Sequence, residues 1–376
     1  MKLLITGDLA ITKQYPQKNI DQKVIDLFQS SDYNIVNLEA PVTESNSKII
    51  KTGPHLKANK ESTSEVLKTL SVNLCTLANN HVLDYDEEGV LDTLQFCEQN
   101  KIATVGAGKN KEEASKTFYI DSAEGKIAII NIAENEWASA TESNAGANGM
   151  DLIDDVNQIK EAKATHDKVI CIIHGGHLHY ELPSPQVQKR YRFYADNGAD
   201  AIIAHHTHRT GGFELYDNCP ILYGLGSFLF TRDKSNNDEW YYGLITRLNI
   251  EKHKPINFEI FPSKTTKNSF HIHLLEGDDK VVMFDKIQHI NNIINDSKLI
   301  QENWNRQLNT NPKYLLNLLS PINDIPSKYL KAALNKLGLS KLFLNQSFKR
   351  NLLNLTRCEA HAESLKAFLE QDIKKK

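Results

Sequence analysis

The stretch from Ala199 to His208, with the sequence A-D-A-I-I-A-H-H-T-H, constrains the fold more than any other part of the chain. Residues 201–204 are typical of a buried parallel strand, and this strand stops at His205, His206 and His208. Ligands in α/β proteins usually bind at the carboxyl ends of parallel strands. In an extended segment, His206 and His208 lie on one side, within reach of one metal ion. A solvated polar loop explains the same residues, so this stretch alone leaves both interpretations open.

Four further strand-like runs also end at polar residues that can bind metals. The runs cover Lys2–Thr6, Tyr33–Leu38, Val72–Leu77 and Lys168–Ile173, and the residues that follow them are Asp8, Glu39, Asn80, His81 and His174. Helices are expected between the first runs, and strands that alternate with helices form largely parallel sheets. The strand ends then face the same way and converge on one site. Each polar residue alone has a structural explanation, such as a turn or a helix cap, but together they favour a metal site.

These strand ends offer nitrogen and oxygen ligands and no cysteine, which suits manganese, iron or zinc. The candidate ligands are Asp8, Glu39, Asn80, His174, His206 and His208. This set is too large for one tetrahedral ion and suits two divalent ions, with Glu39 as the bridging carboxylate. Such a pair of ions activates water for attack on a phosphoester. His81 is the candidate to protonate the leaving group, and Asp84 is the candidate to orient His81.

Several blocks of sequence carry a resemblance to a known family. They are G-D at 7–8, N-L-E at 37–39, L-A-N-N-H-V-L-D-Y-D-E-E-G-V-L-D-T-L at 77–94, T-V-G-A-G at 104–108, H-G-G at 174–176, G-A-D-A-I-I-A-H-H-T-H at 198–208 and Y-G-L-G-S-F-L-F at 223–230. The chain resembles the CapA family of poly-γ-glutamate capsule-synthesis proteins over about residues 1–250. That family is itself similar to the calcineurin-like metallophosphoesterases.

The resemblance implies a fold and a function. The fold is a four-layer α/β/β/α sandwich that carries the ligands named above. The function is that of a metal-dependent, phosphoesterase-like hydrolase in capsular or other extracellular polymer biosynthesis. Its substrate is then a phosphoester or an anionic polymer precursor. The alternative is a non-catalytic metal-binding accessory protein of a polymer synthesis or export complex.

One metal position departs from the metallophosphoesterase pattern. The usual D-x-H block is here Asp8-Leu9-Ala10, so this position has lost a histidine. It keeps Asp8, Glu39 and His208, and His205 is an additional candidate ligand.

Further departures affect the expected substrate contacts. Leu178 stands where a glutamate often follows H-x-G, and His177 and His179 are the candidates to replace it. Ser227 stands where asparagine is usual and is a candidate substrate contact. Arg190, on a helix expected at 186–195, is a second one, although a solvated helix face explains it equally well.

Composition limits the classes of partner and the location. The formal net charge of −3 gives no basic signature for nucleic acid. No run of about eighteen apolar residues occurs, so no transmembrane helix is expected, and the N-terminus lacks the apolar stretch of a signal peptide. The five cysteines are widely spaced without a C-x-x-C pair and are expected to be reduced. The resulting prediction is a cytoplasmic protein.

The length of 376 residues allows two domains. We expect the CapA-like domain at 1–265 and a mostly helical extension at 266–376, with leucine-rich stretches at 314–319, 329–337 and 341–355. The extension is expected to pack on the catalytic domain or on another subunit. Alternatively, the basic amphipathic segment at 341–357 contacts an anionic polymer, a membrane surface or a partner enzyme of polymer biosynthesis.

Overall fold

The computed structural model describes residues 1–51, 53–232, 238–310, 325, 327–339, 345–357 and 369. The chain forms two compact units, Met1–Gln301 and Glu302–Lys376. The first unit runs beyond the boundary predicted at residue 265, because β16 (Ile272–Leu274) pairs with β15 (Asn257–Thr265). In the same unit, α7 (Gly277–Ile294) contributes Met283 and Ile287 to the core.

The first sheet carries the N-terminal strands of the chain. Its order is β16-β15-β14-β1-β2-β3-β4, and β13 pairs with the end of β1. The remaining strands are β1 (Lys2–Ala10), β2 (Tyr33–Leu38), β3 (Leu74–Thr76), β4 (Ala103–Val105), β13 (Ser227–Phe230) and β14 (Tyr242–Asn249). Strands β1 to β4 are parallel, so their carboxyl ends lie at one edge.

The second sheet has the order β11-β12-β10-β9-β7-β6. Its strands are β6 (Phe118–Ser122), β7 (Gly125–Ala133), β9 (Lys168–His174), β10 (Ala201–His205), β11 (Phe213–Tyr216) and β12 (Cys219–Leu222). Strands β7, β9, β10 and β12 are parallel. A separate small sheet pairs β5 (Ala107–Gly108) with β8 (Gly146–Ala147). The predicted site residues therefore come from two sheets. Asp8 lies in β1 of the first sheet, and Glu39 and Asn80 come after β2 and β3. The histidines lie at or just after the ends of β9 and β10 in the second sheet.

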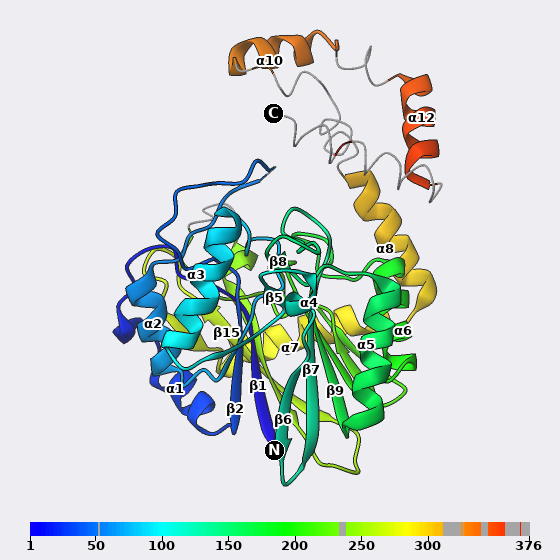
Figure 1. Ribbon diagram of the computed structural model, residues 1–376. Coiled ribbons are helices and arrows are strands. Elements are labelled where there is room, and N and C mark those ends of the chain that lie inside the picture. Colours follow the sequence, from blue (N-terminus) through cyan, green and yellow to red (C-terminus); the bar gives the residue numbers. More distant parts are fainter. Residues whose placement is uncertain are drawn as a thin grey trace. The chain divides into compact units, whose positions relative to one another are not determined.

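Helices cover the outer face of each sheet (Figure 1). On one side lie α1 (Gln22–Gln29), α2 (Lys60–Thr69) and α3 (Asp86–Gln99), and on the other lie α5 (Leu152–Thr165) and α6 (Pro185–Asp196). Several begin at side-chain caps, for example Asp21 for α1 and Ser184 for α6, which accept backbone hydrogen bonds from Lys23 and Val187. The short elements of this unit are η1 (Gln17–Asn19), α4 (Lys111–Ala114) and η2 (Asp238–Tyr241).

The alternation of side chains along β1 builds two separate layers of core. Leu3 and Ile5 lie between the two sheets, where they join Ile172 of β9 and Ile203 of β10. Leu4 points the other way, into the core beneath the helices of the first sheet. The predicted four-layer α/β/β/α sandwich is confirmed by this arrangement.

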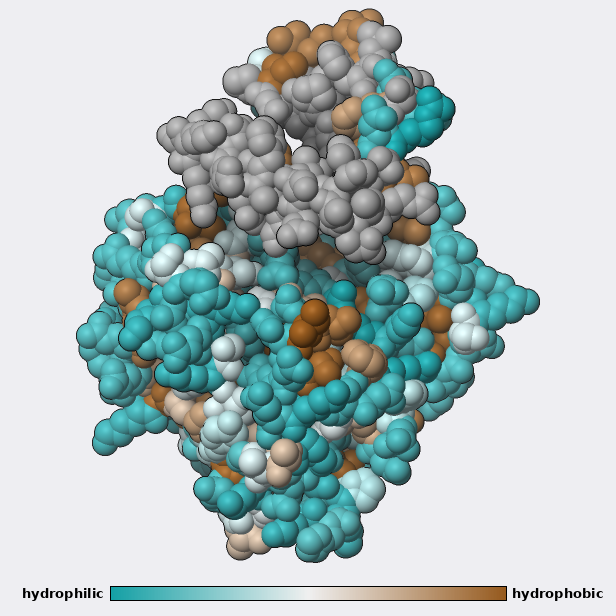
Figure 2. All heavy atoms as spheres, turned by 45° about the vertical axis from the view of Figure 1, so that its right-hand side comes forward, coloured by the Kyte–Doolittle hydropathy of each residue, from teal (hydrophilic) through white to brown (hydrophobic). Residues whose placement is uncertain are grey.

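The outer surface of the first unit is largely hydrophilic on the side turned forward in Figure 2, apart from a local hydrophobic patch. This agrees with helices that bury one face, as α6 does with Val187, Tyr191 and Tyr194. Cys75, Cys97, Cys171 and Cys219 are buried free thiols, as predicted for them.

The C-terminal region contains α8 (Ser297–Thr310), α10 (Lys328–Lys336) and α12 (Gln346–Arg357). Helix α10 overlaps the leucine-rich stretch predicted at 329–337. The stretch at 314–319 and residues 341–344 lie outside the described residues. No helix in the described part of the chain is long and apolar enough to cross a membrane.

The substitution Ile172→Ala is expected to lower the free energy of unfolding by about 2–5 kcal/mol, because Ile172 is fully buried between the sheets. Leu215→Ala, at an exposed position of β11 in the same sheet, is the control and is expected to change the free energy of unfolding by less than about 0.5 kcal/mol. Urea titrations of both variants measure the difference. Equal effects would contradict a core between the two sheets.

Candidate metal centre

The first group of candidate ligands consists of Asp8, Glu39 and His208. Each offers one ligand atom, these atoms lie within 4.8 Å of one another, and all three residues are buried. Asp8 lies in β1, which continues to Ala10 instead of ending at Thr6 as predicted. A register irregularity between Ile5 and Asp8 interrupts the pairing of β1 with β2 here.

Asp8 is held in place by polar neighbours on both sheets. Asn37 Nδ2 donates a hydrogen bond to Asp8 Oδ1 at 2.7 Å, and His205 Nδ1 lies 3.1 Å from the same oxygen. The backbone N–H of His206 donates to Asp8 Oδ2 at 3.2 Å, and His208 Nδ1 lies 3.3 Å from that oxygen. His205, predicted as an additional ligand, therefore meets Asp8 directly.

The second group consists of Asn80, His174 and His206. His174 Nε2, at the end of β9, lies 3.1 Å from Asn80 Oδ1 and 3.2 Å from His206 Nδ1. Asn37 Nδ2 lies 3.2 Å from the other ring nitrogen of His174. The three ligand-type atoms thus converge from three different strand ends.

Glu39 lies between the two groups. Its Oε1 is 3.8 Å from His174 Nε2 and 3.5 Å from His208 Nε2. Glu39 is fully buried, and neither of its carboxylate oxygens has a hydrogen-bond partner among the described residues. Ligand atoms around a tetrahedral ion with bonds of about 2.1 Å lie about 3.4 Å apart. The types of ligand atom and their spacing therefore fit a metal ion. A buried carboxylate without a hydrogen-bond partner is unfavourable, and a bound cation would compensate for this.

Protonation of the site is coupled to metal binding, because a metal ion must displace the proton from Glu39 before this carboxylate can ligate it. Burial, together with the negative charge of Asp8, raises the pKa of Glu39 well above its usual value. Burial also opposes the ionised form of Asp8, but the hydrogen bond from His205 and the charges of His205 and His208 outweigh it and lower the pKa of Asp8. Burial lowers the pKa of His174 and of His206, which keeps both imidazoles neutral, as metal ligands must be.

The backbone after β10 is strained. His206 has a φ of +85° and His208 a φ of +49°, in the left-handed region that side chains other than glycine rarely occupy. The assumption of an extended segment was therefore wrong, because β10 ends at His205. The two imidazoles lie in different groups, with His206 beside His174 and His208 beside Asp8 and Glu39.

His81 and Asp84 form the expected contact. Asp84 Oδ2 lies 2.7 Å from His81 Nδ1 and accepts a hydrogen bond from the backbone N–H of Leu56 at 2.6 Å. Sequence reasoning missed Lys51, whose Nζ contacts the other oxygen of Asp84 and lies 3.3 Å from His81 Nδ1. No motif singles out this lysine, which occurs in a polar loop between β2 and α2.

The remaining candidates belong to neither group of ligands. His177 and His179 are exposed, and the ring of His179 packs against Trp240, which in turn packs against His208. Ser227 Oγ lies 3.2 Å from His208 Nδ1. The guanidinium of Arg190 contacts the sulfur of Met150 and lies 3.6 Å from Glu134 Oε1.

Sequence reasoning also missed the acidic residues that follow β7. Glu136 Oε1 accepts a hydrogen bond from Asn80 Nδ2 at 3.2 Å and lies 3.7 Å from His206 Nε2. Strands β6 and β7 pair antiparallel. Because β7 also pairs parallel to β9, it is a further strand that ends at the site. The signal was available in E-N-E at 134–136.

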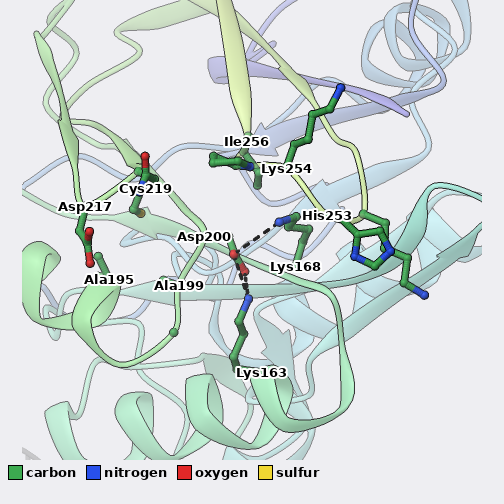
Figure 3. A pocket seen from close by; sticks show the side chains of 14 residues that line it. Lys163, Lys168, Ala195, Ala199, Asp200, Asp217, Cys219, His253, Lys254 and Ile256 are labelled. Atoms are coloured by element: carbon green, nitrogen blue, oxygen red, sulfur yellow. Dashed lines mark hydrogen bonds and ion pairs between the residues drawn. The ribbon is translucent and has the colours of Figure 1, made fainter.

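A separate cleft of about 360 Å³ lies near the amino ends of β9 and β10, at the opposite end of these strands from the centre. Figure 3 shows Lys163 and Lys168 pointing toward Asp200 within it. Lys163 Nζ is 2.7 Å from Asp200 Oδ2, and Lys252 pairs with Asp167 and Lys254 with Glu251. These acidic partners balance the lysines, so the cleft is a poor candidate for an anion site.

Two facing sheets with a buried acid and histidine centre at their strand ends define an α/β/β/α sandwich protein with a candidate metal site. A family model described as bacterial capsule synthesis protein PGA_cap matches residues 2–232. The chain belongs to this family, and the predicted CapA resemblance is confirmed.

The relatives that the chain matches include two CapA proteins. It is 31% identical over 257 residues to the PGA biosynthesis protein CapA of Bacillus subtilis, covering 67% of this chain and 66% of that protein. It is 29% identical over 229 residues to the capsule biosynthesis protein CapA of Bacillus anthracis, covering 58% and 56%. The chain thus spans less than two thirds of the length of these relatives.

Among solved structures, it is similar to a phosphatase of Mycoplasma pneumoniae, with a TM-score of 0.44 and 13% identity over 72% of this chain and 95% of that one.

The substitution Glu39→Gln is expected to stabilise the metal-free protein at pH 8. Because the pKa of Glu39 is raised above its ordinary value of 4.5, this carboxyl is protonated to a greater extent in the folded protein than in the unfolded chain. The stability that the protonated carboxyl contributes is present below pH 4.5 and is lost as the pH rises through the folded pKa. Glutamine does not titrate, so the variant keeps this stability. Urea unfolding in EDTA at pH 5 and pH 8 measures the effect.

Glu136→Gln is the matched control for this experiment, because Glu136 is at the same centre but 43% exposed. It is expected to change the pH dependence little. Metal addition is expected to stabilise the wild type more than Glu39→Gln. If Glu39→Gln is less stable than the wild type in EDTA at pH 8, the account of the buried carboxylate is wrong.

Proposed function

We propose that this chain is a metal-dependent hydrolase of a phosphoester or a related anionic polymer precursor, and that it acts in capsular or other extracellular polymer biosynthesis. The observation that carries the proposal is Glu39, a buried carboxylate without a hydrogen-bond partner among the described residues and surrounded by ligand-type atoms. Membership of the capsule-synthesis family and the printed names of the two CapA relatives support the biosynthetic role.

Two divalent ions are part of the proposal. Asp8, Glu39 and His208 would hold one ion, and Glu39, Asn80, His174 and His206 would hold the other. The mixed nitrogen and oxygen donors suit manganese, iron or zinc. Bound there, such ions polarise a phosphoryl oxygen and lower the pKa of water.

The side chains of the protein supply the remaining steps. His81 is the proposed general acid, which donates a proton to the leaving-group oxygen, because it directly follows Asn80 in the sequence and its ring is held by Asp84. Asn37 and His205 fix the carboxylate of Asp8 and so orient one side of the centre. Arg190 and Ser227 stay proposed substrate contacts, although Ser227 also supports His208.

The proposal extends to location and partners. A cytoplasmic location is supported by the four buried free thiols among the described residues. A partner protein of polymer biosynthesis is proposed to contact the C-terminal helices, where α10 and α12 expose the apolar side chains of Tyr329, Leu330 and Leu353.

A non-catalytic accessory role is the second candidate. It is favoured by Leu9 and Ala10 after Asp8, where metallophosphoesterases usually have a histidine. In that case the first group of ligands binds metal weakly or not at all. The ions then stabilise the fold or a binding surface instead of activating water.

Metal analysis by mass spectrometry, paired with turnover of bis-p-nitrophenyl phosphate in added manganese, tests the proposal. We expect about two metal ions per wild-type chain. His206→Ala is expected to lower the metal content and to reduce turnover on the order of 100-fold. His253→Ala, an exposed histidine at the far cleft, is the control and is expected to leave both unchanged.

The outcomes separate the two candidates. About one ion per chain without turnover would favour the accessory role. No metal under any loading condition would contradict both, because both rest on the same ligands.

A further inference from the structure

We propose that Lys51 is a positioning residue that fixes the orientation of His81 through the buried carboxylate of Asp84. The inference rests on the proposed hydrolase function, because that function gives His81 a leaving group to protonate. It adds a residue from the loop between β2 and α2 to a centre that is otherwise built from strand ends.

The evidence is a buried three-residue contact. The side chain of Lys51 is 3% exposed and that of Asp84 is fully buried. Lys51 Nζ contacts Asp84 Oδ1, while Asp84 Oδ2 lies 2.7 Å from His81 Nδ1. Lys51 Nζ also lies 3.3 Å from His81 Nδ1. One carboxylate therefore joins the ammonium to the imidazole.

A buried ammonium and a buried carboxylate are both costly unless they are paired. Lys51 and Asp84 form such a pair, with Lys51 Nζ donating to Asp84 Oδ1. The second oxygen is then held toward His81 and the backbone N–H of Leu56, at 2.6 Å from the latter. Without Lys51, the contact of the first oxygen is lost, and the last torsion of Asp84, which is broad for Asp, is less restricted. The ammonium thus determines where the oxygen that holds His81 lies.

The loop that carries Lys51 is attached to Asp84 at further points. The backbone N–H of Ile49 donates to the carbonyl oxygen of Asp84 at 3.4 Å, and Leu56 donates to its side chain. His55 Nε2 lies 2.8 Å from the carbonyl oxygen of Ile49, which closes the loop on itself. Lys51 is therefore held by the loop on both sides, as a positioning residue requires.

The orientation of His81 matters for the proposed reaction. With Nδ1 committed to Asp84, Nε2 is the ring nitrogen that meets a leaving group. His81 directly follows Asn80, whose Oδ1 lies 3.1 Å from His174 Nε2. Rotation of the ring would change the direction in which Nε2 points, and such misplacement lowers kcat more than it changes substrate binding.

The test compares Lys51→Met with Lys48→Met, which removes an exposed lysine from the same loop. With bis-p-nitrophenyl phosphate and manganese, Lys51→Met is expected to lower kcat about 10–100-fold. KM and the metal content are expected to stay unchanged. Lys48→Met is expected to match the wild type. Equal kcat values for Lys51→Met and the wild type would overturn the proposal, as would a loss of activity explained by lost metal.

A second variant guards against loss of folding. Lys51→Met alone leaves the carboxylate of Asp84 buried without its cation, whereas Lys51→Met/Asp84→Asn removes both charges. The double variant is expected to recover the urea midpoint of the wild type and to keep the low kcat. If it regains wild-type kcat together with stability, Lys51 has only a structural role and the proposal is wrong.

A measurement that does not depend on turnover tests the role of Lys51 separately from the proposed hydrolase function. In nitrogen-15 NMR spectra, the ring N–H signal of His81 is identified by its absence from the spectrum of His81→Gln. We expect this signal in the wild type and its loss or broadening in Lys51→Met, because the hydrogen bond to Asp84 is no longer held. A wild type that turns over no phosphoester contradicts the hydrolase function alone, whereas an unchanged His81 signal in Lys51→Met contradicts the role of Lys51.

Discussion

The structure depends on a buried carboxylate that the protein itself does not satisfy. Glu39 lies between His174 and His208 with no hydrogen-bond donor among the described residues aimed at either oxygen. In a fold that satisfies most of its buried polar groups, such an exception calls for a functional explanation. A positively charged ligand at this point accounts for it, and the strained backbone at His206 and His208 shows that the chain also tolerates unfavourable conformations to bring imidazoles there.

Two facing sheets create this environment. The first sheet delivers Asp8 and Glu39, and the second delivers the histidines that follow β9 and β10. Neither sheet alone assembles the ligand set, so the core between the sheets, with Ile5 on one side and Ile172 on the other, fixes the distances in the centre. Stability and chemistry are therefore linked, because packing between the layers sets the spacing of ligands that belong to different layers.

Sequence patterns predicted much of this arrangement, and their failures have physical reasons. Apolar runs before Asp8, Glu39, Asn80, His174 and His205 were correctly recognised as strands, because buried parallel strands are almost continuously apolar. The four-layer fold came from the family resemblance, since periodicity does not tell whether strands join one sheet or two. The same strands were predicted, but not their assignment to separate sheets.

The contacts of individual side chains were less predictable. Lys51 was missed because a loop lysine carries no periodic signal, and only tertiary structure brings it to His81. Glu136 was missed although E-N-E follows an apolar run in the sequence, and the fold brings it to His206. His206 and His208 were placed near the centre for the wrong geometric reason, since the backbone turns left-handed instead of staying extended. The local sequence pattern thus identified which strand ends form the site. Which side chains contact one another across the site could be known only from the folded structure.

The most direct test of the central claim is anomalous X-ray diffraction from crystals of the protein soaked in manganese. The account predicts anomalous peaks on both sides of the Glu39 carboxylate, one toward His208 and one toward His174. Crystals that diffract well but show no peak within bonding distance of Glu39 would contradict the claim that this carboxylate is a metal ligand.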